Sequence, residues 1–329
     1  MSQFKIVITD FGDPDSTPEI EVIKASGLDA EVVRLQARTP DELLPAVADA
    51  DGLLVQWVKV TPEVMDRMSK CKVISRYGIG VDMIDVAAAT AHGIMVCNVP
   101  DFCIDEVSTH TLAFVLSLNR HMWQHHQHVK SGKWGGPPGG APTRLSCQTL
   151  GIVALGNIGR EVARKASAFG VKVLGYDPYV KPQLLQGLDV ELVGLEELLR
   201  RSDYVSLHCP LVEETRHLIG AAQLALMKPT AYLINMARGP VVDQPALYQA
   251  LAAGTIRGAA LDVLEQEPPA PDDPLLKLDN VLFTPHAASW TTEAGAQLRL
   301  DTARNVVTAL QGKLPKAIVN RKGLNLPEA

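Results

Sequence analysis

The sequence lacks the features of a secreted, membrane-spanning or zinc-binding protein. Its five cysteines form no C-x-x-C pair, and their odd number fits neither a disulfide framework nor a zinc site. The apolar run from Thr109 to Leu118 is far shorter than the roughly 20 residues that a membrane span needs. The N-terminus shows no basic segment followed by an apolar core and a cleavage site. We therefore expect reduced thiols, no bound metal and a cytoplasmic protein.

The chain also has no excess of basic residues over acidic ones. The chain has 31 Lys and Arg against 37 Asp and Glu, a net charge of −6, so no net positive field exists to hold nucleic acid or an anionic membrane surface. We expect neither as a partner. The composition is otherwise that of a folded protein, with 47% hydrophobic residues in a chain of 329. At roughly 150 residues a domain, this length indicates about two domains.

Short runs rich in β-branched residues alternate with stretches of helical spacing, a pattern that predicts βαβ units and parallel sheets. The predicted strands are 5–9, 31–35, 52–57, 72–75 and 94–99, followed by 150–155, 171–177, 204–210, 231–237, 258–264 and 280–285. An amphipathic helix at about 104–130 and a Gly- and Pro-rich loop up to 148 connect the two series, and a last helix covers about 292–310. We predict an α/β fold with two domains: residues 1–102 with 290–329, a discontinuous domain in which the last helix packs on the first sheet, and residues 103–289.

A glycine-rich turn lies between a predicted strand and a helix in the second domain. Gly156 allows backbone to approach a pyrophosphate closely, Gly159 allows close helix packing, and Asp177, 21 residues after Gly156, ends the next strand. This arrangement is typical of a dinucleotide site, and a carboxylate at the ribose favours NAD over NADP. Ala154 takes the place of the first glycine, which is acceptable if its φ is negative. A tight turn that binds nothing is the alternative interpretation.

Three further polar residues follow strands of the same series. Arg238, Glu267 and His286 come after the predicted strands that end near 237, 264 and 285. In a parallel sheet they would meet at the carboxyl edge, where ligands of open α/β sheets bind. The alternative interpretation is a structural ion-pair network.

Taken together, these segments resemble the D-isomer-specific 2-hydroxyacid dehydrogenase family, in particular its phosphoglycerate dehydrogenase and C-terminal-binding-protein-like branches. The resemblance covers nearly the whole chain and is carried by residues 76–100, 151–180, 202–220, 227–243, 258–268 and 284–289. It implies a Rossmann-type NAD-binding domain, residues 103–289, and a flavodoxin-like substrate-binding domain. It also implies an NAD-dependent oxidoreductase that acts on the CH–OH group of a D-2-hydroxyacid, or reduces the corresponding 2-keto acid.

The resemblance assigns a role to each of the three polar residues. Arg238 would bind the carboxylate and carbonyl oxygens of the substrate through its planar fork. His286 would donate the proton in reduction and accept it in oxidation, because imidazole exchanges protons near neutral pH. Glu267 would hydrogen-bond to the imidazole, orient it and favour its protonated form.

The remaining contacts are implied in the same way. Substrate would meet Arg76, Tyr77, Gly78 and Ile79, with the amides of Gly78 and Ile79 holding its carboxylate; an exposed turn is the alternative for Arg76. The cofactor would be held by Gly156, Asn157, Ile158, Gly159, Asp177, Cys209, Pro210, Met236, Ala237, Arg238, Asp262 and His286.

Some questions stay open at this stage. An NAD(H)-sensing, corepressor-like binding protein is the alternative function. Trp290 favours an apolar substrate, whereas Arg76 favours one with a second anionic group.

A homodimer is expected by resemblance, with apolar surface offered by residues 123–134. His121, His125 and His128 have the i, i+4, i+7 spacing of one helix face, but no carboxylate or cysteine completes a metal site there.

Overall fold

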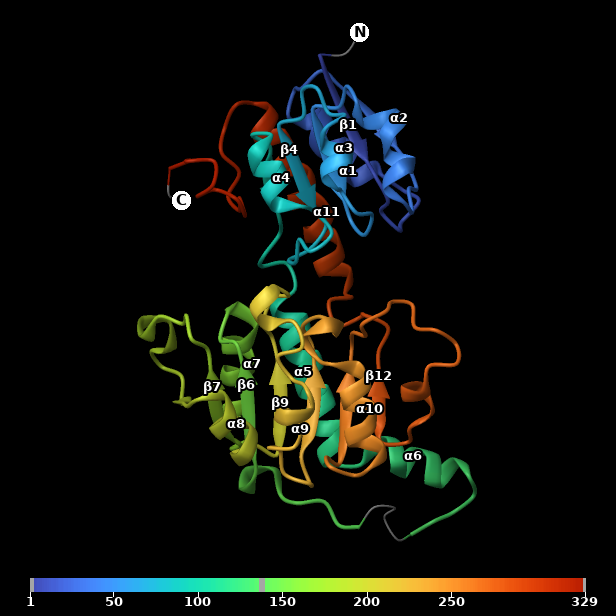
Figure 1. The fold of residues 1–329 in the computed structure, drawn as a ribbon, viewed down its shortest axis with the longest axis vertical. Coiled ribbons are helices and arrows are strands. Elements are labelled where there is room, and N and C mark those ends of the chain that lie inside the picture. The colour runs from blue at the N-terminus through green and yellow to red at the C-terminus, as the bar shows by residue number, and fades with distance from the viewer. Residues whose placement is uncertain (1–2, 136–139, 328–329) are drawn as a thin grey trace. The chain divides into compact units, whose positions relative to one another are not determined.

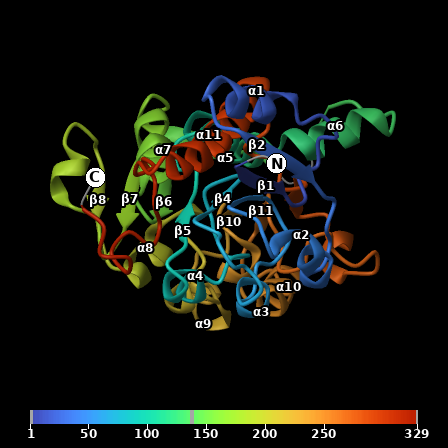
Figure 2. The ribbon, with the colours of Figure 1, turned by 90° about the horizontal axis from the view of Figure 1, so that it is seen from above.

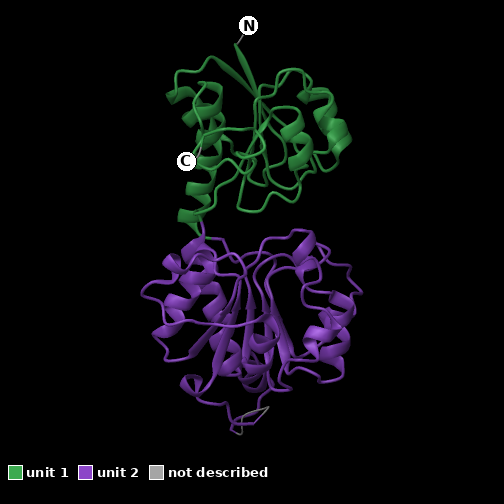
Figure 3. Cartoon of the chain, turned by 60° about the vertical axis from the view of Figure 1, so that its left-hand side comes forward, with its two compact units in different colours: residues 1–102, 291–329 green, residues 103–290 purple. Residues whose placement is uncertain are grey.

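The structure is a computed structural model that describes residues 3–135 and 140–327. The chain divides into two compact units, coloured separately in Figure 3. Unit 1 comprises residues 1–102 and 291–329, and unit 2 comprises residues 103–290. Each unit is built on a parallel β-sheet flanked by helices. The predicted α/β fold class is therefore confirmed.

Within its described residues, the sheet of unit 1 has five strands in the order β2-β1-β3-β4-β5, which is the flavodoxin order. The strands are β1 (Phe4–Ile8), β2 (Ala30–Arg34), β3 (Gly52–Val55), β4 (Val73–Arg76) and β5 (Met95–Cys97). Each corresponds to one of the predicted strands. Every residue of β3 and β4 is buried, because helices cover both faces of the sheet, and such strands appear in the sequence as apolar runs.

Helices lie on both sides of this sheet (Figure 2). One side carries α1 (Thr17–Ala25) and α11 (Thr292–Leu310), and the other carries α2 (Leu44–Val47), α3 (Pro62–Met65) and α4 (Val86–Ala91). Helix α11 comes so close to β3 that a Cβ atom on Gly52 would lie 2.8 Å from Val306 Cγ1. The prediction that the last helix packs back on the first sheet is confirmed.

A buried ion pair joins α11 to α1. Arg299 Nε donates to Glu19 Oε1 at 2.8 Å and its Nη2 to Oε2 at 2.7 Å. Glu19 is 1% exposed and Arg299 9% exposed. The bidentate geometry satisfies both carboxylate oxygens, which a charge buried at this depth requires.

Among residues 103–135 and 140–290, unit 2 forms a sheet of seven strands in the order β12-β11-β10-β9-β6-β7-β8. These are β6 (Thr149–Val153), β7 (Lys172–Tyr176), β8 (Glu191–Leu192), β9 (Tyr204–Leu207), β10 (Tyr232–Asn235), β11 (Gly258–Leu261) and β12 (Val281–Phe283). The order has the Rossmann pattern, since the chain moves outward from β6 to β8 and then from β9 to β12. Six of the strands were predicted.

Strand β8 was not predicted. It has two residues, Glu191 and Leu192, and both are exposed, so the sequence shows no apolar alternation there. The edge is held instead by backbone pairing with β7 and by Arg201 and Lys172, which both contact the Glu191 carboxylate.

The helices of unit 2 are α5 (Ile104–Asn119), α6 (Met122–Lys130), α7 (Asn157–Ser167), α8 (Leu195–Arg201), α9 (Ala221–Leu224) and α10 (Gln244–Ala252). The single helix predicted over 104–130 is wrong, because the chain breaks between α5 and α6. His121 adopts φ 51°, a left-handed conformation, and the Asn119 side chain before it is buried and donates to the carbonyl of Thr143 and to Gln148 Oε1. Residues 136–139 of the predicted loop lie outside the described residues.

Candidate active site

The three predicted catalytic side chains follow neighbouring parallel strands. Arg238 comes three residues after β10, Glu267 six residues after β11 and His286 three residues after β12. These strands pair side by side with all their carboxyl ends at one edge of the sheet, which is visible in Figure 1 as the shared direction of the arrows for β6, β9 and β12. The structure brings Glu267 and His286 into direct contact, with Nδ1 of the imidazole 2.6 Å from Oε2 of the carboxylate.

The Glu267 carboxylate is ionised near neutral pH. Its burial acts to raise the pKa, but the hydrogen bond and charge of His286, the Leu264 amide and the charge of Arg238 outweigh burial, and the pKa lies below the ordinary value of 4.5. Because an ionised carboxylate only accepts hydrogen bonds, the Nδ1 atom of His286 carries a proton. The opposite ring nitrogen, Nε2, is then the atom that can exchange a proton with a substrate.

The loop that carries His286 is held by Asp262, a buried residue directly after β11. Its carboxylate accepts from Thr284 Oγ1 at 2.5 Å, from the Ala287 amide at 2.8 Å and from the Ala288 amide at 3.1 Å. The Asp262 carbonyl also accepts the His286 amide at 2.8 Å, which supports the left-handed φ of 53° at His286. Asp262, predicted as a cofactor contact, therefore also positions the imidazole.

Sequence reasoning missed one partner of this loop. His110, on α5, has its Nε2 atom 3.1 Å from Thr284 Oγ1. The two residues are 174 positions apart, and no motif or spacing links them.

The turn after β10 positions Arg238. The side chain of Asn235, 1% exposed, accepts the Ala237 amide at 3.1 Å and donates to the Arg238 carbonyl at 3.0 Å. A Cβ atom on Gly239 would lie 1.9 Å from the carbonyl carbon and oxygen of Leu264, so the turn lies against the segment that leads to Glu267. This close approach requires glycine and sets the spacing between the loops that carry Arg238 and Glu267.

The β6–α7 turn has the shape of a phosphate cradle. A Cβ atom on Gly156 would meet no heavy atom of the described residues within 4 Å, and helix α7 begins directly after it. The first amides of that helix, at Asn157 and Ile158, have no partner within the helix, so they and the positive end of its dipole suit an anion. A Cβ on Gly159 would lie 2.1 Å from the Ala154 carbonyl oxygen, which explains the glycine there. These features fit the pyrophosphate of NAD.

Ala154 does not meet the condition under which alanine is acceptable at this position. That condition is a negative φ, but Ala154 has φ 72°. The first position of the turn therefore uses the left-handed conformation that glycine adopts freely and alanine adopts at a cost of about 1–2 kcal/mol. The positive φ arises because the turn, and not the residue type, sets the backbone here: the Ala154 amide donates to the Tyr176 carbonyl at 2.8 Å.

The other predicted cofactor residues lie at the same edge. Asp177 follows β7 and accepts the amides of Leu155 and Tyr179, each at 2.8 Å. The remaining residues follow β9 or β10 and are Cys209, Pro210, Met236 and Ala237, of which Pro210 is exposed and the others buried.

His208 was not predicted, although it lies in the matching H-C-P segment. Burial lowers the pKa of His208 to about 3, so its imidazole is neutral. Its Nε2 atom lies 2.9 Å from Ser206 Oγ, and its buried Nδ1 atom has no hydrogen-bond partner among the described residues. The His208 amide donates to the Val153 carbonyl at the end of β6, which places this residue beside the glycine turn.

The predicted substrate loop of unit 1 follows β4. Tyr77 is 2% exposed, stacks on Phe11 at 4.3 Å and donates from its hydroxyl to Glu19 at 3.2 Å, so only its backbone can meet a ligand. The Gly78 amide donates to the Arg76 carbonyl at 2.9 Å. Of the two predicted anion-binding amides, the one at Ile79 donates to no group among the described residues.

The position of the Arg76 side chain requires glycine at residue 78. The Arg76 guanidinium lies 5.4 Å above the Trp57 ring, and a Cβ atom on Gly78, at φ 139°, would lie 1.6 Å from Arg76 Nη1. Only glycine leaves room for this arginine, which is itself buried.

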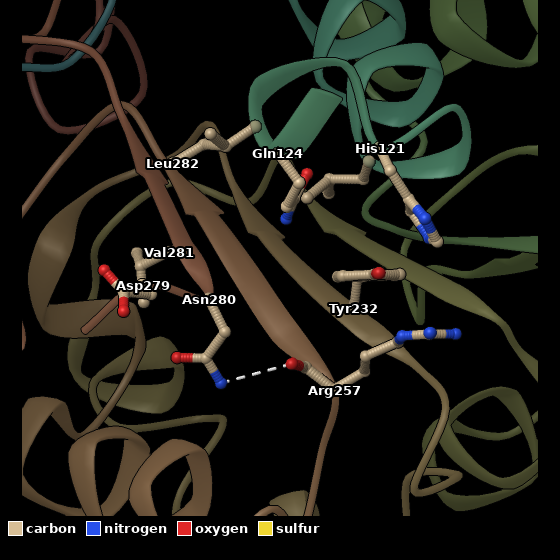
Figure 4. Close-up of a pocket in the computed structure, with 9 residues that line it drawn as sticks. His121, Gln124, Tyr232, Arg257, Asp279, Asn280, Val281 and Leu282 are labelled. Carbon is tan, nitrogen blue, oxygen red and sulfur yellow. Dashed lines mark hydrogen bonds between the residues drawn. The ribbon is translucent and has the colours of Figure 1, made fainter. Parts of the chain in front are cut away.

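The histidine cluster does not form one face of a helix, because His121 precedes α6 and has a left-handed backbone. The buried His121 side chain lines a cavity of about 200 Å³ together with Tyr232, Arg257 and Asn280 (Figure 4). This cavity lies near the amino ends of β10, β11 and β12, whereas Arg238, Glu267 and His286 follow the carboxyl ends of these strands. Over residues 3–135 and 140–327, no group of three or more His, Cys, Asp or Glu side chains is placed to hold a metal.

In the described part of the chain, no helix is long and apolar enough to cross a bilayer. The cysteines form no disulfide among the described residues.

The chain is similar to known proteins of one family. The family model described as "D-isomer specific 2-hydroxyacid dehydrogenase, NAD binding domain" matches residues 112–288. A D-3-phosphoglycerate dehydrogenase of Methanocaldococcus jannaschii is 42% identical over 98% of this chain, and the chain spans 60% of the length of that relative. A glyoxylate reductase of Thermofilum pendens is also 42% identical, over 87% of this chain and 86% of its own length.

A solved structure is similar over both units. The D-lactate dehydrogenase of Aquifex aeolicus, complexed with NAD and lactic acid, is 31% identical, with a TM-score of 0.87 over 95% of this chain and 98% of its own. The match of the family model and the identity to these relatives over most of the chain lead to one assignment. The chain belongs to the D-isomer specific 2-hydroxyacid dehydrogenase family.

Proposed function

We propose that this chain is an NAD-dependent D-2-hydroxyacid dehydrogenase that reduces a small 2-keto acid and, in reverse, oxidises the 2-hydroxyacid. The observation that carries the proposal is the 2.6 Å contact between His286 Nδ1 and an ionised Glu267, beside Arg238 and at the same sheet edge as the glycine turn. This is the arrangement that proton transfer to a carbonyl oxygen needs.

The cofactor would be held by the amides of the turn around Gly156 and by Asp177, and when bound its nicotinamide supplies or takes the hydride. The Arg238 guanidinium would bind the substrate carboxylate and polarise its carbonyl oxygen. His286 Nε2 would give its proton to that oxygen as it becomes a hydroxyl. Glu267 would keep the imidazole oriented and stabilise its charged form.

The substrate-binding role of unit 1 is part of the proposal. The Ile79 amide and the buried Arg76 are the groups of that loop suited to an anion. Trp290 is 71% exposed, and the Trp57 ring already covers one face of Arg76. The carboxylate of a small keto acid would bind to this anion-binding loop, beside the Trp57 ring of the same unit.

A panel of keto acids tests the function. Purified protein is mixed with NADH and, separately, with glyoxylate, hydroxypyruvate, phosphohydroxypyruvate, 2-ketobutyrate, phenylpyruvate and 4-methylthio-2-oxobutyrate, and the loss of NADH absorbance is followed. We expect turnover with at least one of them, and the one with the largest kcat/KM identifies the substrate class. No NADH oxidation with any 2-keto acid would contradict the proposal. That result would favour the alternative, a corepressor-like NAD(H)-sensing protein. The presence of Arg238, Glu267 and His286 and the matched relatives do not favour this alternative.

We also propose a cytoplasmic homodimer. All nine residues of α6 are described and none is buried, although the segment includes Met122, Trp123 and Val129, with Trp134 beyond it 90% exposed. Exposed apolar surface of this kind suits a second copy of the chain. Sedimentation at micromolar protein should give twice the 35.5 kDa mass of one chain.

A further inference from the structure

Arg160 lies at the end of the first turn of α7 and donates hydrogen bonds to the glycine turn that precedes this helix. Its Nη1 atom donates to the Leu155 carbonyl at 2.8 Å, and its Nη2 atom donates to Asn157 Oδ1 at 2.8 Å. The two acceptors lie on either side of Gly156, so the guanidinium spans the part of the backbone that would face the pyrophosphate. The fork geometry of arginine makes both contacts at once, which a single ammonium group cannot do in the same way.

The turn that Arg160 contacts has a strained backbone. Ala154, directly before the clamped segment, has φ 72°, and alanine favours this conformation less than an extended or helical one. Without a restraint, Ala154 would relax, and the carbonyl of Leu155 and the following amides would turn with it. The Leu155 amide donates to Asp177 at 2.8 Å, so the two charged side chains hold the two peptide groups on either side of the Leu155 Cα atom.

We propose that Arg160 is a positioning residue for the cofactor, which keeps the turn at Ala154 in its left-handed, NAD-binding shape before NAD arrives. The inference rests on NAD binding by this family, and it does not depend on which keto acid is the substrate. Arg160 acts here through the shape of the backbone, and its positive charge alone is not sufficient. The specific consequence is a coupling between Arg160 and Ala154, because glycine at 154 would adopt φ 72° without help.

The test is a double-mutant cycle on the full-length protein with Arg160→Met and Ala154→Gly. We expect Arg160→Met to raise the Kd for NADH about tenfold, since two charge-assisted hydrogen bonds are lost. The KM for NADH should rise similarly, while kcat at saturating NADH stays within about twofold, because the catalytic residues lie after other strands. In the Ala154→Gly background, Arg160→Met should raise the Kd only about threefold or less.

Arg164→Met is the matched control. It removes the same charge from the same helix, one turn further on, where the side chain is exposed and pairs with Glu161. It should leave the Kd for NADH within about twofold of the wild-type value. Arg160→Lys separates shape from charge and serves also if Arg160→Met does not fold: it keeps the charge but loses the fork, so we expect weakened binding that Ala154→Gly again restores.

Amide hydrogen exchange in the cofactor-free protein gives a readout independent of binding. Loss of Arg160 should speed exchange at the Leu155 amide about tenfold, and Ala154→Gly should reverse the change. Wild-type affinity in Arg160→Met or in Arg160→Lys would overturn the inference, and so would a double variant that binds NADH as weakly as Arg160→Met. Failure of wild-type protein to bind NADH would instead overturn the proposed function, and the exchange measurement would still decide the role of Arg160.

Discussion

Replacing Glu267 by glutamine removes one charge and one acceptor from the catalytic pair. Glu267 uses both oxygens: Oε2 contacts His286 Nδ1 at 2.6 Å, and Oε1 accepts the Leu264 amide at 3.0 Å. Glutamine has a single acceptor oxygen, so one of these two donors must lose its partner. A hydrogen bond to a charged group contributes about 1.5–3 kcal/mol, so we expect reduction of the best keto acid to slow by about tenfold to a hundredfold.

The pH dependence has a definite sign. The pKa of Glu267 lies below its ordinary value, so the carboxylate is charged throughout the neutral range and favours the protonated imidazole that reduction requires. The pH above which kcat/KM for reduction falls should therefore move to more acid values in Glu267→Gln. His286→Gln should lower kcat by about 10² or more and keep NADH affinity.

The assay is NADH oxidation between pH 5 and 9, with NADH affinity measured separately by fluorescence. The double variant should lose less than the sum of the two single losses, expressed as free energies, because both residues act through one proton. Glu265→Gln is the control, because Glu265 also contacts a histidine, His217, at 2.9 Å. It should leave the pH profile unchanged. An unshifted profile in Glu267→Gln, or full activity in His286→Gln, would refute the assigned roles.

Three other predictions concern cofactor choice and stability. Wild-type protein should bind NADH more tightly than NADPH, because a carboxylate at the ribose repels a 2′-phosphate, and Asp177→Ser should narrow this difference in affinity. Equal affinities of the wild type for the two cofactors, measured by titration, would contradict the assignment of Asp177 to the ribose. Gly239→Ala should lower the free energy of unfolding by about 3 kcal/mol or more in urea denaturation, since its Cβ would overlap the Leu264 carbonyl at 1.9 Å; an unchanged midpoint would show that this turn can move. Arg299→Met should cost about 3–5 kcal/mol by leaving the charge of Glu19 buried without its partner, and a loss below about 1 kcal/mol would show that water reaches the carboxylate.

Much of the fold was predictable because its strands are buried on both faces. β3, β6 and β10 are short apolar runs with β-branched residues, and helices with apolar spacing separate them, so the sequence itself displays the alternation. The position of the candidate catalytic residues was predictable for a related reason. Parallel strands gather their carboxyl ends at one edge, so Arg238, Glu267 and His286 could be placed together from their positions after successive strands.

The rest depends on contacts that are distant in sequence or on backbone angles. The break before α6 has no glycine or proline to mark it, since His121 itself takes the left-handed conformation. The positive φ at Ala154 is set by the turn around it, and alanine gives no signal of it. The support of the His286 loop by Asp262 and His110 joins three separate segments, and it becomes visible only when β11, β12 and α5 lie together.

The ion pair between Glu19 and Arg299 has a consequence for the order in which the protein assembles during synthesis. Residues 1–102 leave the ribosome first, but the face of their sheet that α11 covers, including Gly52 against Val306, stays open until residues 292–310 have been made. All of residues 103–290 are synthesised in between, and they form a sheet and core of their own. Unit 2 can therefore fold while unit 1 still waits for its last helix, and a chain stopped before residue 292 would leave Glu19 without its arginine and the first sheet open to aggregation.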